Sequence, residues 1–542
     1  MNREQLIEIV FLLVLFGGLL YIGPGSLFQH SLNHEKPDQY GATDGFLYAM
    51  LSEYVAETGN FKYYPQYSVE GFTDAIPHHP PILMHLAAMF AHTSGLSAYS
   101  SLSLIMGIFV LFGAFIMYWL IRSWNQKVAI LAAPLFVFLY VSKFVVGYTW
   151  GEALLLMGTF FLIALFYIMS KPELKPWWVP AGILIAASIN THTSETIFFY
   201  GFAVFFLAAK FVLKQMTKEE LVKWLKMLAL ASLLAVILSF NYLPIFYNGY
   251  YKIAGGGYTS FKPMSPEEFG AIQVPPLQDF HWPVLIAILL GVVIAAVLAK
   301  KNSHVALLTS IYMFLVGLTN YIGLHYRAFQ TRFLWPIYLA LFFGLAIYFI
   351  LKQVRITSIL ITAVLGIALA AVFSNAYYSP IQTGAIYDEQ WQGMTWLEQN
   401  TPDNSRVLFL FGDGYSQSAR VLKRQAFQIE PADYGRFISA LPNRSMRIEP
   451  VMIAEMKYLH RTGIFSFGYY ALEKNMTDGF RPMDICSFDY YVVDKRSGYA
   501  PQLIQANLQV ANTMIAHNMS GVYQNDHLAI LQNNNVGGDC LA

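Results

Sequence analysis

Charge is scarce in this chain of 542 residues, because Asp, Glu, Lys and Arg together make up only 12% of it. The formal net charge is +1, so no overall electrostatic field favours a nucleic-acid partner. The sequence also contains no P-loop, no dinucleotide-binding fingerprint, no zinc-ligand spacing and no nucleophile elbow. These absences exclude the enzyme classes that such motifs define, and they direct attention to the apolar residues.

Hydrophobic residues make up 56% of the sequence, and the mean hydropathy is +0.45, which indicates a polytopic membrane protein. Runs of about 17–25 apolar residues predict about eleven transmembrane helices. The first run, Leu6 to Tyr21, is followed by Gly23-Pro24-Gly25 rather than by a cleavage site, so we expect a retained signal anchor. The predicted spans are 6–24, 98–121, 128–146, 153–170, 177–191, 195–213, 224–242, 282–299, 304–322, 333–351 and 356–374.

Basic residues predict the orientation in the cell membrane. Arg3, the pair Lys300 and Lys301, and the pair Lys352 and Arg355 all fall on one side, together with the Lys-rich loops near 122–127, 171–175 and 210–226. The positive-inside rule makes that side cytoplasmic, and it places the N-terminus there. We therefore expect a transmembrane region over residues 1–375, with a large first external loop at 25–97.

The tail, residues 376–542, changes character. Its apolar runs shorten to strand length, as at 406–411 and 490–493, and helical patterns lie between them. This pattern predicts an extracytoplasmic α/β or α+β domain. Both cysteines of the chain, Cys486 and Cys540, lie here, and an oxidising compartment would allow them to pair whereas a cytosolic one would leave them as thiols.

Carboxylates stand out in three predicted external segments. Asp44 opens an amphipathic helix that carries Glu53 and Glu57 on its polar face, whereas Glu152 and Glu195 each stand at the mouth of a predicted span. A carboxylate at membrane depth is costly unless it is paired, coordinated or facing water, which makes these acids candidates for a functional site. The alternative is structural, because acidic residues also cap and stabilise helix N-termini, and a solvated face would then explain Glu53.

Cationic candidates lie on the same predicted side. His78 and His79 precede Pro80-Pro81, which fixes an extended entry into a helix, and this pair is either a phosphate or metal site or an interfacial turn. Arg327 and Arg332 flank a late span on the side opposite the Lys-rich loops. Guanidinium groups match phosphate oxygens well, although ordinary snorkelling to lipid is the alternative.

The order of these parts resembles the GT-C superfamily of integral membrane glycosyltransferases. Ala42-Thr43-Asp44-Gly45-Phe46 is similar to the acidic motif of the first external loop, and His79-Pro80-Pro81 is similar to its later Pro-Pro element. Glu152 alone matches the acidic motif of the second external loop, and Arg332-Phe333-Leu334-Trp335-Pro336 looks like the late Arg-aromatic run. The resemblance implies a sugar donor linked to polyprenyl phosphate or polyprenyl pyrophosphate, and an extracytoplasmic acceptor.

The tail is similar to the soluble domain of the prokaryotic oligosaccharyltransferase catalytic subunit. Trp396-Leu397-Glu398-Gln399-Asn400-Thr401-Pro402 resembles its lead-in. However, the Trp-Trp-Asp-Tyr-Gly element that reads the acceptor is represented only by Phe411-Gly412-Asp413-Gly414-Tyr415. The loss of both tryptophans argues against transfer of a whole glycan to asparagine.

The sequence therefore predicts a GT-C-type glycosyltransferase. Asp44 would deprotonate or orient the acceptor or bind a divalent ion, either Mg²⁺ or Mn²⁺, with help from Glu152. His79, Arg327 and Arg332 would neutralise the departing phosphate. A loop with Gly255-Gly256-Gly257 and Glu267-Glu268 is either a closing segment or a plain connector. A divergent oligosaccharyltransferase and a non-enzymatic transporter or polymer-export component remain as alternatives.

Overall fold

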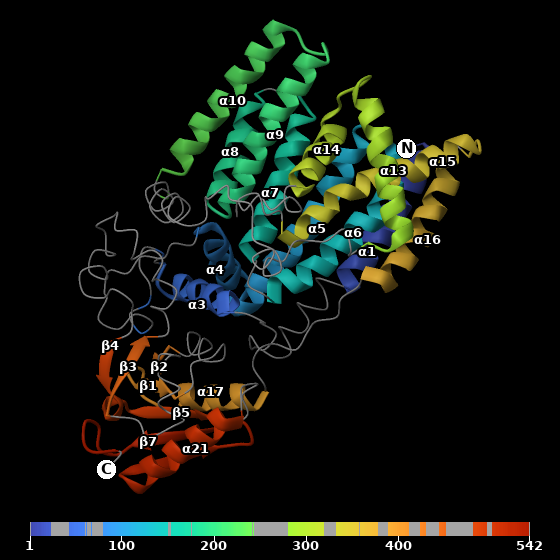
Figure 1. Cartoon of the computed structure of the whole chain (residues 1–542). Helices are drawn as coiled ribbons and strands as arrows, with labels where there is room; N and C mark the ends of the chain where they lie inside the picture. Colours follow the sequence, from blue (N-terminus) through green and yellow to red (C-terminus); the bar gives the residue numbers. More distant parts are fainter. Residues whose placement is uncertain are drawn as a thin grey trace.

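The apolar runs of the sequence form helices in the structure, which is a computed structural model (Figure 1). Each predicted span overlaps a helical segment. These segments are α1 (Arg3–Ile22), α5 (Ala98–Arg122), α6 (Gln126–Thr149), α7 (Ala153–Met169), α8 (Trp178–Ile189), α9 (Thr193–Val212), α10 (Lys218–Leu238), α13 (Trp282–Ala299), α14 (Val305–Leu318), the 3-10 segment η7 (Arg332–Leu339) that leads into α15 (Ala340–Gln353), and α16 (Ile359–Tyr377).

The structure describes residues 2–22, 43–59, 61, 65, 67, 80–149, 153–174, 176–240, 242, 280–318, 332–356, 358–377, 388–410, 423–429, 444–450, 481–495 and 501–540. Within these ranges, six helices are long and apolar enough to cross a membrane: α5, α9, α10, α13, α15 with the end of η7, and α16. The protein is therefore a polytopic helical membrane protein.

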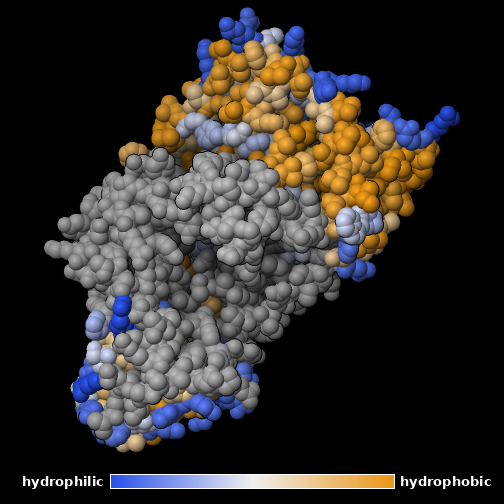
Figure 2. All heavy atoms as spheres, viewed as in Figure 1, coloured by the Kyte–Doolittle hydropathy of each residue, from blue (hydrophilic) through white to orange (hydrophobic). Residues whose placement is uncertain are grey.

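The surface of the helical bundle carries the signature of lipid contact. Large apolar side chains are exposed along its outer helices, including Val204, Ile286 and Val293, each at least 63% exposed. Figure 2 shows this hydrophobic surface, with hydrophilic residues at the far tips of the helices. Since isolated apolar residues on a soluble surface do not form such a continuous band, the band marks the hydrocarbon-facing side.

Glycines allow several helices of the bundle to pack closely. A Cβ built on Gly291 of α13 would lie 1.9 Å from the carbonyl oxygen of Phe342 in α15. A Cβ on Gly344 of α15 would lie 2.7 Å from the carbonyl oxygen of Val128 in α6. Membrane helices associate through van der Waals contact rather than through a hydrophobic driving force, so small residues at crossings are what permits this packing.

A buried carboxylate joins α1 to the bundle. Glu8 is 4% exposed, and its oxygens accept hydrogen bonds from Tyr118 Oη at 2.5 Å and Gln126 Nε2 at 2.7 Å. Arg122 donates to both oxygens, with Nη2 at 2.9 Å from Oε2. The charge is therefore paired and hydrogen-bonded, as a carboxylate inside a membrane protein must be.

Two short helices lie between the bundle and the C-terminal sheet (Figure 1). They are α3 (Thr43–Thr58) and α4 (Ile82–Ser94), and both pack against each other and against α5. The predicted apolar face of the first helix is buried, with Phe46, Leu47, Met50 and Leu51 at most 1% exposed. This burial fixes α3, and with it the backbone of Asp44, against the bundle.

The C-terminal part contains one mixed sheet of seven strands in the order β4-β3-β2-β1-β5-β7-β6, with β1 parallel to both β2 and β5. Val407 and Phe409 belong to the core that includes α17, whereas Leu408 and Leu410 face the core that includes α21. The elements are α17 (Asp388–Asn400), β1 (Arg406–Phe409), β2 (Gln425–Ile429), β3 (Ser445–Pro450), β4 (Arg481–Asp484), η10 (Ile485–Ser487), β5 (Tyr490–Asp494), α21 (Pro501–Ala516), β6 (Met519–Gln524) and β7 (Leu528–Asn533).

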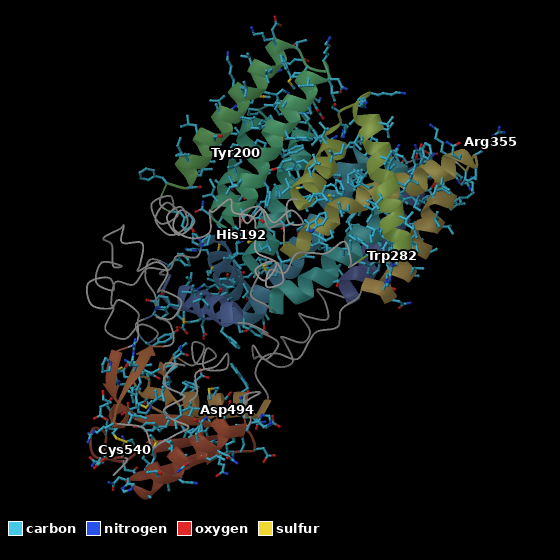
Figure 3. All side chains as sticks on the ribbon, viewed as in Figure 1. His192, Tyr200, Trp282, Arg355, Asp494 and Cys540 are labelled. Atoms are coloured by element: carbon cyan, nitrogen blue, oxygen red, sulfur yellow. A yellow bond between two sulfur atoms is a disulfide. The ribbon has the colours of Figure 1, made fainter. Side chains whose placement is uncertain are left out.

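A disulfide between Cys486 and Cys540, which the sequence left open, ties η10 to the segment after β7. Both sulfurs belong to buried residues in the core under α21. Figure 3 shows Cys540 within the C-terminal domain. The bridge spans 54 residues of chain and so restricts the unfolded state of the domain.

We expect Gly291→Ala to destabilise the bundle, because the added methyl group would overlap the backbone of α15. Overpacking of this kind costs about 1–3 kcal/mol. Gly17→Ala in α1 is the matched control, since its Cβ would meet no atom within 4 Å. Thermal unfolding of the purified protein in detergent measures both variants, and equal midpoints would contradict the close packing of α13 and α15.

We expect the two cysteines to resist alkylation by a maleimide polymer in the denatured protein until a reductant is added, because they are the only cysteines of the chain. Removing the bridge with Cys486→Ser and Cys540→Ser should lower stability by up to about 4 kcal/mol. A gel shift without reductant would disprove the pairing. Each single variant serves as a control, because it frees one thiol for labelling.

Candidate functional site

A half-buried histidine and a buried glutamate form a pair at the N-terminal end of α9. His192 is the N-cap residue of that helix, and Glu195 lies in its first turn. The His192 ring nitrogen Nδ1 is hydrogen-bonded to Glu195 Oε2. Glu195 is only 2% exposed. The hydrogen bond from His192 therefore offsets part of the free-energy cost of burying this carboxylate. In Figure 3, His192 lies at the end of the bundle that faces α4, far from Arg355.

Other helices surround this pair. A Cβ on Gly158 of α7 would lie 2.9 Å from Glu195 Oε2 and equally close to His192 Cβ, so the glycine makes room for both side chains. Tyr140 of α6 and Tyr338 of η7 are also buried, at 0% and 2% exposure, and both lie within electrostatic range of Glu195. The acid therefore packs against α7, in the same buried region as these two tyrosines.

The turn between α8 and α9 is also hydrogen-bonded to the start of α4 and to the end of α10. The amide of Ile82, the first residue of α4, donates to the carbonyl of Asn190 at 3.2 Å. The Asn190 side chain donates to Ser239 Oγ at 2.8 Å, which ties in the end of α10. Because Ile82 follows Pro80-Pro81 directly, the His-Pro-Pro element predicted from sequence leads into a helix that is fixed to this turn.

Of the predicted site residues, Glu195 is the one whose side chain the structure describes. Asp44 is the second residue of α3 and Arg332 is the first residue of η7, with only their backbones described. Tyr338 of η7, the segment that begins with Arg332, lies within electrostatic range of Glu195. The other candidates lie outside the described residues: His78, His79, Glu152, Glu267, Glu268 and Arg327.

The sequence did not indicate the partner of Glu195. It predicted this acid as a functional-site candidate, with helix capping as the alternative, and the structure shows the carboxylate bonded to His192, three residues earlier. The His-x-x-Glu spacing was a usable signal, because residues three apart on a helical turn are neighbours. Tyr140 and Tyr338 had no such signal, since each is one of 35 tyrosines and comes from a distant helix.

Metal ligands are few in the part of the chain that the structure describes. There, no group of three or more His, Cys, Asp or Glu side chains gathers. His192 and Glu195 offer one nitrogen and one oxygen, and they are already bonded to each other. Protein sites for divalent ions need more donors than this pair supplies, so the pair by itself does not fit a metal.

The helical bundle with a C-terminal sheet domain has the same fold as solved structures of ArnT and of AglB. Solved structures share it over nearly the whole chain, at low sequence identity. ArnT from Cupriavidus metallidurans bound to undecaprenyl phosphate matches with a TM-score of 0.58 and 12% identity, over 96% of this chain and 97% of that chain. No protein-family model matches the sequence, and no curated protein matches it.

A second neighbour is the archaeal oligosaccharyltransferase AglB from Archaeoglobus fulgidus. Its complex with an inhibitory peptide and a dolichol-phosphate matches with a TM-score of 0.57 and 13% identity, over 91% of this chain and 70% of that chain. The complex of the same protein with Zn and sulfate matches with a TM-score of 0.56 and 13% identity, over 89% and 68%. At these identities, the comparisons establish the fold.

We expect His192 and Glu195 to be energetically coupled. A double-mutant cycle of His192→Ala and Glu195→Ala, followed by thermal unfolding in detergent, should give a coupling of about 1–3 kcal/mol, because each single variant leaves its partner unsatisfied. Glu195→Gln keeps a hydrogen-bond acceptor and should lose less stability than Glu195→Ala. Additive single variants would show that the two side chains do not interact.

Proposed function

We propose that the protein is a glycosyltransferase that moves a sugar from a polyprenyl-phosphate-linked donor to an extracytoplasmic acceptor. The observation that carries this proposal is the fold, which matches ArnT almost end to end in both chains. That structure holds undecaprenyl phosphate, and the matching AglB structure holds a dolichol-phosphate. Two neighbours with the same fold thus bind the same class of lipid.

The topology is part of the proposal: eleven spans within residues 1–375, with the N-terminus in the cytoplasm and residues 376–542 outside. Charge placement supports it. Lys171 and Lys210 both interact electrostatically with His304, and Gln215 of the same end donates to the carbonyl of Lys300 at 3.0 Å. Basic loops thus gather at one end of the bundle, as the positive-inside rule requires of the cytoplasmic end. The disulfide in the tail suits an oxidising compartment on the opposite side.

In the proposed reaction, an oxygen or nitrogen of the acceptor attacks the anomeric carbon of the sugar. The bond from that carbon to the phosphate oxygen breaks, and the polyprenyl phosphate leaves as an anion. Asp44 accepts the proton of the acceptor, with Glu152 holding the acceptor in place. His79, Arg327 and Arg332 stabilise the anion that departs. His78, Glu267 and Glu268 are further candidates on the same side.

The pair of His192 and Glu195 fits this scheme as the support of the site. Glu195 lies within electrostatic range of Tyr338 in η7, while the carbonyl of Asn190 in the same turn accepts a hydrogen bond from the start of α4. The turn is thus related to η7, which begins with Arg332, and to α4, which follows His79 in the sequence. A rigid turn of this kind positions catalytic groups that would otherwise depend on flexible loops.

A divalent ion, Mg²⁺ or Mn²⁺, bound by Asp44 and Glu152 belongs to the same proposal, because carboxylate oxygens are the ligands that these ions prefer. Such an ion would supply positive charge for the acceptor or for the phosphate.

An oligosaccharyltransferase is the alternative, and one observation on the sequence weighs against it. The Trp-Trp-Asp-Tyr-Gly element that reads the acceptor is represented only by Phe411-Gly412-Asp413-Gly414-Tyr415, without either tryptophan. This favours an acceptor other than an asparagine side chain.

We expect Asp44→Asn to lower sugar transfer by about 10²–10⁴-fold, because the amide cannot accept the proton of the acceptor. The measurement uses purified protein, a polyprenyl-phosphate sugar and acceptors extracted from membranes of cells lacking the protein, with products identified by mass spectrometry. Glu219→Gln, an exposed carboxylate at the opposite end of the bundle, is the matched control. Unchanged transfer by Asp44→Asn would remove Asp44 from the mechanism, and transfer to an Asn-x-Thr peptide would favour the alternative.

A further inference from the structure

A lysine of the C-terminal domain reaches across to a helix of the membrane domain. Lys423 lies just before β2, and its Nζ is 3.1 Å from Glu53 Oε1. The same ammonium donates a hydrogen bond to Glu57 Oε1. Glu53 and Glu57 stand one turn apart on α3, so one lysine bridges both acids. The sequence suggested a solvated face for Glu53, but the structure pairs it with a residue about 370 positions away.

The charges around this contact are unequal. Glu398 of α17 interacts electrostatically with Glu53, as does Glu57. Burial raises the pKa of the Glu53 carboxyl, Lys423 opposes that rise, and the two other acids add to it. Lys423 therefore supplies the positive charge that opposes the two acids near Glu53. Without Lys423, Glu398 on one domain would repel Glu53 on the other.

Lys423 has an unusual backbone conformation. Its φ is 55°, a left-handed conformation that glycine or asparagine adopts with less strain than lysine. The next residue, Arg424, is 4% exposed and donates to Thr401 Oγ1 at 3.0 Å and to the carbonyls of Glu398 and Thr401 at 2.6 and 2.8 Å. Arg424 thus binds the start of β2 to the end of α17, whereas the side chain of Lys423 contacts α3.

We propose that Lys423 is a positioning residue that docks the C-terminal domain on α3 and thereby sets the access of the acceptor. This inference rests on the proposed transferase function. Glu53 lies roughly 14 Å along the helix from Asp44, at 1.5 Å per residue, so the lysine acts through the position of the domain and not on the reacting atoms. The lipid donor is held in the membrane domain, whereas the acceptor arrives from the side where the C-terminal domain lies.

The decisive measurement compares the KM for the acceptor with the KM for the donor. We expect Lys423→Glu to raise the KM for the acceptor by about three- to tenfold, as the loss of two half-buried ion pairs and the added repulsion imply, while the KM for the donor stays unchanged. Lys423→Gly relieves the backbone strain and should fold at least as well as the wild type, yet still raise the acceptor KM. Equal changes in both KM values, or none with either variant, would overturn the proposal.

Charge exchange provides the rescue. A triple variant, Lys423→Glu with Glu53→Lys and Glu57→Lys, restores opposite charges across the contact and should return the acceptor KM towards the wild-type value. Lys495→Glu, a lysine elsewhere in the same domain, is the matched control and should leave both KM values unchanged. A triple variant as impaired as Lys423→Glu alone would contradict the docking role.

A test without catalysis separates this inference from the proposed function. Carbodiimide joins an ammonium to a carboxylate in direct contact, so the full-length protein should yield a cross-linked peptide between Lys423 and Glu53 or Glu57 by mass spectrometry. Absence of that peptide would refute the docking. If the peptide forms but no sugar transfer is found with any acceptor, the transferase proposal fails while the docking stands.

Discussion

The hydrocarbon core of the membrane is the constraint on which this structure depends, because no water is present there to satisfy a polar group. Two buried carboxylates among the described residues of the bundle show how the chain meets this constraint. Glu8 in α1 accepts hydrogen bonds from Tyr118, Arg122 and Gln126, and Glu195 in the first turn of α9 bonds to His192. Each carboxylate thus has a partner inside the protein, as a charge removed from water requires.

The C-terminal domain is held by a different balance of forces. Val407, Phe409 and Leu528 of its sheet belong to the same apolar core as the membrane helices, so hydrophobic contact contributes to the attachment. Such contact is non-directional and fixes the orientation of two domains only loosely. The ion pairs of Lys423 with Glu53 and Glu57 add direction, because they hold only when the two charge sets face each other. In the proposed docking, charge therefore determines how the C-terminal domain is oriented on α3.

Sequence predicted the elements of this protein well and their contacts poorly, for a physical reason. A membrane span is a run of consecutive apolar residues, so the run at 98–121 predicted α5 almost to its ends. The strands predicted at 406–411 and 490–493 were recognised from local patterns in the same way. The partner of Glu53 lies in another domain, and Tyr140 and Tyr338 reach Glu195 from separate helices. No local sequence pattern predicts interactions between residues so far apart in the chain. The cysteine pairing stayed open because it depends on the compartment as well as on the fold. The roles of Asp44, Glu152 and the arginines rest on motif resemblance and remain proposals.

The shared fold at 12–13% identity follows from the same constraint. Apolar side chains facing lipid can replace one another freely, since lipid does not distinguish leucine from valine, whereas close helix crossings such as that at Gly291 tolerate little change. Identity therefore falls over most of the chain while the architecture persists. One neighbour was solved with an inhibitory peptide and a dolichol-phosphate, and another with undecaprenyl phosphate. If the membrane domain of this chain binds a lipid donor of the same class, as proposed, then the C-terminal domain and its docking on α3 are where we expect the acceptor to be selected.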